Sequence, residues 1–297
     1  MFSLFFQDIS SSGSLLRSSL LAIFLLSISC GIMGSYVIAK RCSYMVGAVS
    51  HSLLGGIGIA RFIQLQKGWG FFTPMLGAIF SAVIVAALIT LLTLRGKQRE
   101  DTVLSAVWAL GMAIGLSCIN AIPGYPEDLH SYLFGNILLV TKAEIYFILI
   151  MDIIIVAAVL LFHNRFLCLC FHEEWLTLRG IKSARYLFFL YVLIALTVVM
   201  LAQVTGIILC LALLILPAAS AAVFKKAMIP IMILASFFCL FASSSGLMLS
   251  YHYDLPVGAT IVEIIGGFYL LAVIGRLIIR KIKSLTIRRS LQKGNQT

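Results

Sequence analysis

Charged residues are scarce in this sequence. They make up only 11% of its 297 residues, whereas a typical soluble domain carries roughly 25%. Acidic residues are the rarer sign, with 11 Asp and Glu against 22 Lys and Arg. Because 61% of the residues are hydrophobic, a water-soluble fold of this length could not bury so much apolar surface. The composition therefore excludes a soluble globular protein and points to lipid as the solvent.

Nucleotide-binding and catalytic motifs are missing as well. The sequence has no Gly-x-x-x-x-Gly-Lys-Ser/Thr phosphate loop, so it cannot hold ATP by that route. It also lacks a His-Glu-x-x-His motif and a Gly-x-Ser-x-Gly nucleophile elbow. A membrane-embedded enzyme or an assembly scaffold is consequently the least supported class. We expect no enzymatic activity and no permanently bound cofactor.

Long apolar runs are what the sequence does contain. A membrane-spanning helix needs about 20 apolar residues. Nine runs meet this requirement, at 17–39, 43–66, 71–94, 102–121, 143–163, 184–203, 205–224, 227–250 and 257–280. The sixth and seventh are separated by a very short polar stretch, so eight spans is the alternative. The sequence predicts an all-α polytopic membrane protein of eight to nine transmembrane helices, formed by a single domain over 1–297.

The positions of the basic residues indicate how the chain is oriented across the membrane. If the N-terminus lies outside, 18 of the 22 Lys and Arg residues fall in loops on the inner side, at the inner ends of the runs beside them or in the tail at about 280–297. This asymmetry follows the positive-inside rule and predicts a cytoplasmic C-terminus. The net charge of +11 is therefore interpreted as membrane topology, and nucleic acid is not an expected partner.

One inner loop, at 164–185, is long enough to hold a partner-binding element. Its segment 171–182 is amphipathic, with Glu173 and Glu174 early and Arg179 late, as a short helix prefers. Gly180 is a plausible helix end. The pattern predicts a short helix on the cytoplasmic face that offers a surface to another protein.

Ionisable side chains inside the apolar runs are candidates for function, because each costs about 2.5–3.5 kcal/mol at mid-span on insertion scales. His51 lies near the middle of the second run and shares a helix face with Gly47, four residues earlier. The glycines at 55, 56 and 58 indicate close helix packing or a helix break. The imidazole is either a ligand for a metal ion in transit or a histidine bonded across a helix interface.

Other acids and one more histidine allow two interpretations each. Asp152 lies in an otherwise apolar run and either binds a cation or forms a structural pair. Glu263 is placed near the outer end of the last run, where a half-solvated acid is expected. His252 and Asp254 fall in an outer loop, where they either meet an incoming cation or binding protein or are simply solvated.

Several stretches of the chain together resemble the ABC-3 family of metal permeases, the membrane subunits of bacterial manganese, zinc and iron(II) importers. The matching stretches are MGSYVIAKR at 33–41, AVSH at 48–51, REDTV at 99–103, LHSYLFGNIL at 129–138, FHEE at 171–174 with Gly180, TGIILCLALLILPAA at 205–219 and SYHYDLPVG at 250–258. Each stretch is weak alone, but their common order makes the resemblance specific.

The resemblance implies a transporter of a divalent metal ion in the bacterial cytoplasmic membrane. The family works by alternating access, as a dimer of permease chains with two cytoplasmic ATPases and an external metal-binding protein. Segment 171–180 matches the part that contacts the ATPase. His51 matches the histidine of the family's Asp-x-x-x-His pair, which favours the metal-ligand interpretation of this residue.

The sequence departs from the family pattern where the acid of that pair is expected, because Gly47 stands there. One neutral nitrogen is a poor site for a divalent ion. Either Asp152 or Glu263 supplies the missing charge, or this chain pairs with a different permease that retains the acid. The runner-up function is an ion-coupled secondary transporter that uses Asp152 and Glu263 as coupling carboxylates and needs no ATPase.

Overall fold

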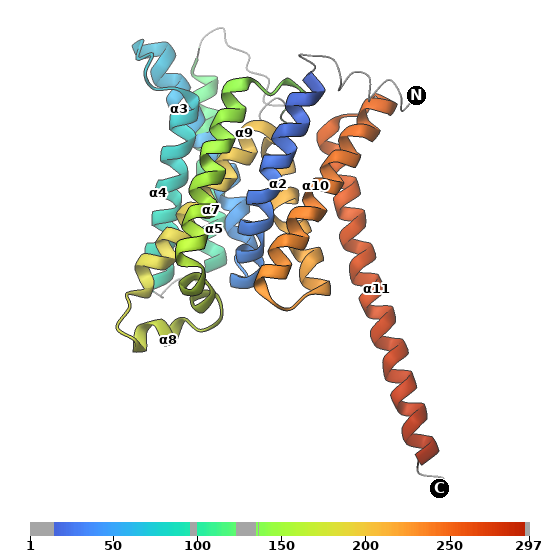
Figure 1. The fold of residues 1–297 in the computed structure, drawn as a ribbon. Helices are drawn as coiled ribbons and strands as arrows, with labels where there is room; N and C mark the ends of the chain where they lie inside the picture. The colour runs from blue at the N-terminus through green and yellow to red at the C-terminus, as the bar shows by residue number, and fades with distance from the viewer. Residues whose placement is uncertain (1–14, 96–99, 123–134, 136, 295–297) are drawn as a thin grey trace.

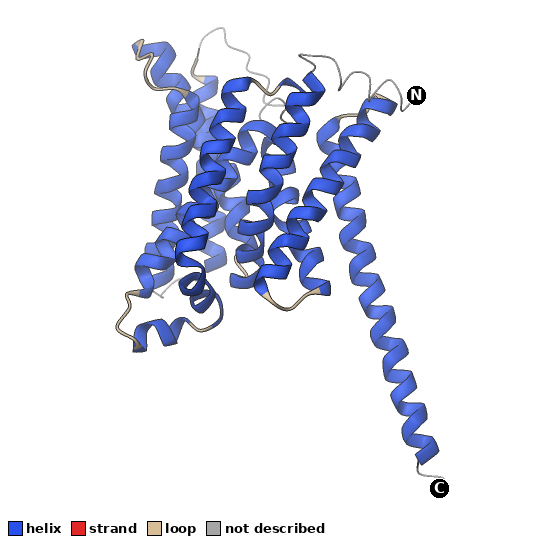
Figure 2. Ribbon diagram, in the orientation of Figure 1, coloured by secondary structure: helices blue, strands red, loops and turns tan. Residues whose placement is uncertain are grey.

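The computed structural model describes residues 15–95, 100–122, 135 and 137–294, and within these ranges the chain forms helices and no strand (Figures 1 and 2). The helices follow in the order α2 (Leu15–Lys40), α3 (Ser43–Lys67), α4 (Pro74–Arg95), α5 (Glu100–Asn120), a 3₁₀ turn η1 (Ile137–Leu139), α7 (Lys142–Phe171), α8 (Glu173–Leu178), α9 (Ser183–Phe224), α10 (Met228–Tyr253) and α11 (Val257–Gly294).

The long helices carry the apolar runs. Eight helices in the described ranges are long and apolar enough to cross a membrane. Helices can span a membrane because their backbone hydrogen bonds are satisfied internally. Their outer faces are apolar because they meet lipid. The prediction of an all-α polytopic protein with eight to nine spans is confirmed.

The difference between eight and nine spans lies in α9. Its 42 residues include Gly206, whose φ of 78° and ψ of 168° are not helical. The Cys210 thiol lies 3.7 Å from the Val198 carbonyl oxygen. In a straight helix, residues 12 apart would be about 18 Å apart along the axis. Helix α9 therefore folds back on itself at Gly206, and its two halves correspond to the sixth and seventh predicted runs.

Helix α3 is clamped between α4 and α5 through glycines. A Cβ atom on Gly55 would lie 2.9 Å from the Gly111 carbonyl oxygen, and one on Gly58 would lie 2.6 Å from that of Gly115. A Cβ on Gly56 would collide with Gly77 of α4. Small residues let helix backbones approach closely inside a membrane. The glycines of α3 therefore serve close packing, and the helix runs unbroken from Ser43 to Lys67.

The bundle has two distinct ends (Figure 1). We call the end at which α2 finishes and α8 lies the basic end, because Lys40, Arg179 and Lys225 belong to it. The start of α2 lies at the opposite end, together with the α10–α11 turn. Helix α11 runs beside α10 and then projects beyond the bundle at the basic end, so the predicted basic tail continues as helix up to Gly294.

Candidate functional site

His51 packs against an aromatic ring of the neighbouring helix. Its imidazole is half-buried on α3 and stacks on the indole of Trp108 in α5, with ring centroids 4.3 Å apart and an interplanar angle of 7°. The indole Nε1 of Trp108 donates to the Met112 sulfur at 3.2 Å, one turn further along α5. The glycine packing between α3 and α5 brings the two rings into contact and fixes the imidazole plane.

Gly47 lies on the same face of α3 as His51. A Cβ atom at this position would lie 3.6 Å from the Trp108 ring and 3.7 Å from Leu211, which are ordinary van der Waals distances. Packing therefore permits a side chain at position 47. Packing therefore does not explain why a carboxylate is absent at position 47. The Trp108 ring borders the space that such a side chain would occupy.

Two buried side-chain polar atoms in the described residues have no hydrogen-bond partner, and both belong to residues singled out from the sequence. They are Nδ1 of His51 and Oδ2 of Asp152. An unsatisfied buried polar atom costs about 1–3 kcal/mol, so folded proteins rarely retain one without a reason. The two atoms mark His51 and Asp152 as residues with unused binding capacity.

Asp152 and Glu263 lie apart from His51 in different settings. Asp152 is 5% exposed on α7, and its Oδ1 accepts a hydrogen bond from the Ser29 hydroxyl of α2. Glu263 is exposed on α11, which packs on α9 and α10. Across the described ranges, no group of three His, Cys, Asp or Glu side chains is arranged to hold a metal ion. A single chain does not bring the three predicted residues into one site.

The predicted short helix in the inner loop is present as α8 (Glu173–Leu178). The Leu176 side chain of α8 is buried against the bundle. The Arg179 guanidinium lies 4.2 Å from the centroid of the Trp175 ring. Gly180 follows with a φ of 71°, a left-handed conformation that favours glycine. Trp175 and Leu178 are 53% and 83% exposed, so the helix presents apolar side chains at the basic end.

The two glutamates of α8 have different surroundings. Glu173 accepts an ion-paired hydrogen bond from Lys40 of α2, with Nζ and Oε2 2.8 Å apart. The same ammonium donates to the Leu169 carbonyl oxygen at 3.2 Å. Glu174 is exposed. Glu173 is thus bonded within the chain, and Glu174 is the acid that faces outward.

His252 and Asp254 lie exposed at the opposite end, where α10 ends. The His252 ring meets Tyr253 edge-on, with centroids 4.7 Å apart. Asp254 adopts a φ of 54° and forms the C-cap of α10. Both residues are placed where a partner arriving at this end of the bundle would meet them.

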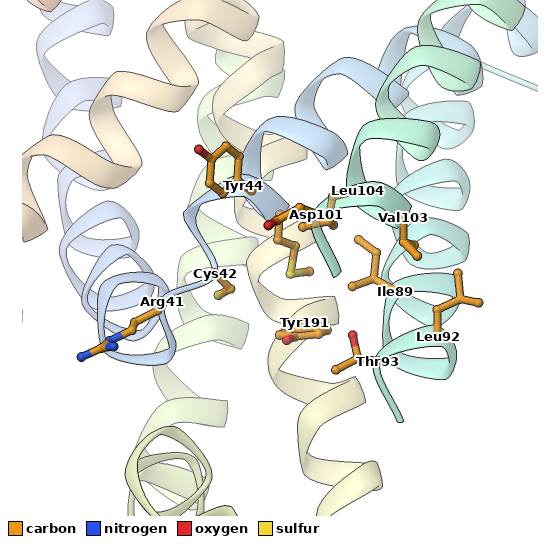
Figure 3. Close-up of a pocket in the computed structure, with 11 residues that line it drawn as sticks. Arg41, Cys42, Tyr44, Ile89, Leu92, Thr93, Asp101, Val103, Leu104 and Tyr191 are labelled. Atoms are coloured by element: carbon orange, nitrogen blue, oxygen red, sulfur yellow. The ribbon is translucent and has the colours of Figure 1, made fainter. Parts of the chain in front are cut away.

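A small cavity lies at the basic end, close to the start of α3 (Figure 3). The α2–α3 turn, the end of α4, the start of α5 and Tyr191 of α9 surround it, and its polar lining includes Cys42, Thr93 and Asp101. Its volume of about 40 Å³ accommodates one or two water molecules. Met45, which also lines it, precedes His51 by about 9 Å along the helix axis.

The model of the ABC 3 transport family matches residues 12–276. The chain belongs to the ABC-3 transport family. A Chlamydia trachomatis protein described as a probable metal transport system membrane protein is 43% identical over 260 residues, which is 88% of each chain. The manganese transport system membrane protein MntC of Halalkalibacterium halodurans is 30% identical, and the match covers 90% of this chain and 89% of MntC.

A solved structure supports the same assignment. PsaBC from Streptococcus pneumoniae in complex with Fab has a TM-score of 0.80 at 26% identity, covering 92% of this chain and 95% of the matched chain. This ABC-3 protein is accordingly a multi-pass permease subunit of an ABC importer, and it is not an enzyme, since the ATPase of such importers is a separate chain. The predicted family, fold and transporter class are confirmed.

Sequence reasoning missed Trp108 and Lys40. The stacking of Trp108 on His51 and the ion pair between Lys40 and Glu173 each join helices that are far apart in the sequence. Because Lys40 lies at the inner end of an apolar run, the sequence pattern indicated only its side of the membrane and not its ion pair. The position of Lys40 inside the MGSYVIAKR stretch was the available signal.

Proposed function

We propose that this ABC-3 permease moves a divalent transition metal ion across the bacterial cytoplasmic membrane along a path that passes His51. The unpartnered Nδ1 of His51 is the observation that carries this proposal. A neutral imidazole with an unengaged nitrogen keeps a lone pair available to a metal once the path opens. The manganese transporter MntC among the relatives supports the same class of cargo.

The basic end is assigned to the cytoplasm and the N-terminus to the outside. The distribution of 18 of the 22 Lys and Arg residues supports this direction. It puts α8 where a cytoplasmic ATPase docks, with Trp175, Leu178 and Glu174 as the contact surface. His252 and Asp254 then face an external metal-binding protein.

A second permease chain completes the metal site. One imidazole supplies too few ligands and no charge for a divalent ion, and the described part of this chain adds no neighbouring cluster. The face of α5 next to His51 is apolar and partly exposed, with Trp108 at 38% and Met112 at 37%. We assign this face to the partner permease, either a second copy or a different chain that retains the acid missing at Gly47.

Transport then follows alternating access. The external protein delivers the ion, ATP-driven closure of the ATPases acts on α8, and the bundle opens the His51 path to the cytoplasm. Charge supply to His51 from Asp152 or Glu263 is less well supported, because these acids lie on α7 and α11 and the described residues form no group of three metal-binding side chains. The secondary-transporter mechanism is less well supported because the chain belongs to the ABC-3 family.

Uptake in reconstituted vesicles tests the proposal. The permease, its ATPase and its binding protein are assembled with ATP inside, and entry of labelled manganese is measured. His51→Ala is expected to abolish uptake at low metal concentration, whereas Gln66→Ala, on the same helix and exposed, is expected to leave it unchanged. Full uptake by His51→Ala contradicts the path. Full uptake by a homodimer identifies the partner permease as a second copy and contradicts a different chain.

A further inference from the structure

One face of α2 carries a row of polar contacts that tie it to α7 and α8. The Ser29 hydroxyl donates to Asp152, Tyr36 Oη shares a hydrogen bond with His163 Nδ1 at 2.7 Å, and Lys40 pairs with Glu173. The three α2 residues are spaced by seven and four positions, so they share one helix face. We call this row the polar ladder.

The ladder is held firmly within the bundle. Ser29 and Tyr36 are fully buried, and the Tyr36 ring meets Phe166 edge-on with centroids 5.7 Å apart. At its base the Lys40 side chain is 17% exposed and makes two bonds, to Glu173 and to the Leu169 carbonyl. A partly buried ion pair whose ammonium also donates a second hydrogen bond holds its geometry better than a fully solvated surface pair.

Helix α8 is separated from each of its flanking helices by a non-helical residue. His172, at the end of α7, has a φ of −146° and a ψ of 65°, outside the helical region. Gly180 precedes α9 in a left-handed conformation, and a Cβ added there would meet nothing within 4 Å. Since the helical path is interrupted at both ends of α8, the ion pair at Lys40 is a direct route by which a displacement of α8 reaches the bundle.

The route continues from Lys40 to His51 over a short, well-defined path. Helix α2 ends at Lys40 with Arg41 at a φ of 60°, and Cys42 and Arg41 donate to the Val37 and Ile38 carbonyls at 3.1 and 3.2 Å. This closed turn leads directly into α3 (Figure 3). Because glycine packing locks α3 to α4 and α5, a pull on the turn moves the helix that carries His51.

We propose that Lys40 is a positioning residue that transmits movement of α8 to the α2–α3 pair, and that its ion pair with Glu173 couples ATP hydrolysis to transport. This inference rests on the proposed function, in which α8 receives the ATPase and His51 lies on the metal path. The contacts of Ser29 and Tyr36 in the polar ladder attach the rest of α2 to α7, so that α2 moves as one piece with its neighbours.

The coupling ratio in the complete importer tests this role. Manganese uptake and ATP hydrolysis are measured together in vesicles that contain permease, ATPase and binding protein. Lys40→Met and Glu173→Gln are each expected to lower the uptake per ATP hydrolysed about tenfold, within the usual range of coupling between sites. ATPase docking, measured by co-purification, is expected to remain. Lys225→Met, an exposed lysine at the same end, is the matched control and is expected to keep the wild-type ratio.

Charge exchange separates coupling from mere structural support. The double variant Lys40→Glu with Glu173→Lys is expected to regain at least half of the wild-type ratio. A wild-type ratio in Lys40→Met, or a proportional loss of hydrolysis and uptake, overturns the inference. A double variant that is as uncoupled as the single variants shows that the pair is not the link.

A distance measurement tests the mechanical link without any metal. Spin labels are introduced site-specifically at Arg179, which directly follows α8 and is exposed, and at Tyr44 of α3, which is 72% exposed. In the ATPase-bound wild type their distance distribution is expected to stay narrow when ATP is added, and in Lys40→Met it is expected to broaden. An equally narrow distribution in Lys40→Met overturns the inference. Absent ATP-driven uptake in wild-type vesicles contradicts the proposed function instead.

Discussion

The imidazole of His51 lies flat on the indole of Trp108, with the two ring centroids 4.3 Å apart. The contact joins α3 to α5 at the point where the family pattern expects an acid and this chain has Gly47. The orientation of the proposed metal ligand is therefore set by an aromatic neighbour, and Trp108 becomes the residue whose alteration most directly tests the site.

Removal of the indole is expected to weaken metal capture. An aromatic stack contributes about 0.5–1.5 kcal/mol, so Trp108→Ala should raise the manganese concentration for half-maximal uptake by about two- to thirteenfold. Trp108→Phe keeps a ring face and should stay within about twofold of wild type. An unchanged concentration dependence in Trp108→Ala would show that the stack does not position the ligand.

A carboxylate at position 47 is expected to be tolerated and to strengthen binding. The contacts of a Cβ at Gly47 are of ordinary length, so Gly47→Asp should fold and should bind manganese at least about tenfold more tightly in a competition assay with a fluorescent chelator. Gly47→Asn has nearly the same shape without the charge and is the control. Equal affinity in the two variants would contradict a role for charge at this position.

Glycine packing around α3 predicts a position-dependent effect of alanine. A Cβ at Gly58 would lie 2.6 Å from the Gly115 carbonyl, whereas one at Gly266 on α11 would meet nothing within 4 Å. Gly58→Ala should destabilise the protein by about 1–3 kcal/mol, and Gly266→Ala should be neutral or stabilising by up to about 1 kcal/mol. Thermal unfolding in detergent measures both. Equal midpoints would argue against tight α3–α5 contact.

The exposed apolar side chains of α8 predict where the ATPase binds. Leu178→Asp is expected to weaken co-purification of the ATPase about tenfold or more, because a charge replaces an 83% exposed leucine at the centre of the proposed contact. Leu255→Asp makes the same change at the opposite end of the bundle and should leave ATPase binding intact. Retained binding by Leu178→Asp would move the docking surface away from α8.

Features that depend on local composition could be predicted from the sequence. Segment length located the helices, and the order of Glu173, Glu174, Arg179 and Gly180 indicated the short helix α8. The rarity of histidine in an apolar run directed attention to His51. The unpartnered Nδ1 agrees with that choice, although the role of His51 in transport stays a prediction.

Features that depend on how helices are rotated against each other could not be predicted. In a membrane both the lipid-facing and the core-facing sides of a helix are apolar, so the sequence pattern does not indicate which side meets a neighbour. The contact of Tyr36 with His163 and that of Ser29 with Asp152 join residues more than a hundred positions apart. The same uncertainty left Asp152 and Glu263 as equal candidates for charge near His51.

The reversal of α9 at Gly206 also constrains how the chain is made. The two apolar halves of this helix are separated by a turn without a polar loop, and Thr205 in that turn is buried. Two apolar halves with almost no polar residues between them have the composition of a helical hairpin, and each half satisfies its backbone hydrogen bonds internally. We therefore expect the two halves to be inserted into the bilayer as one hairpin during synthesis.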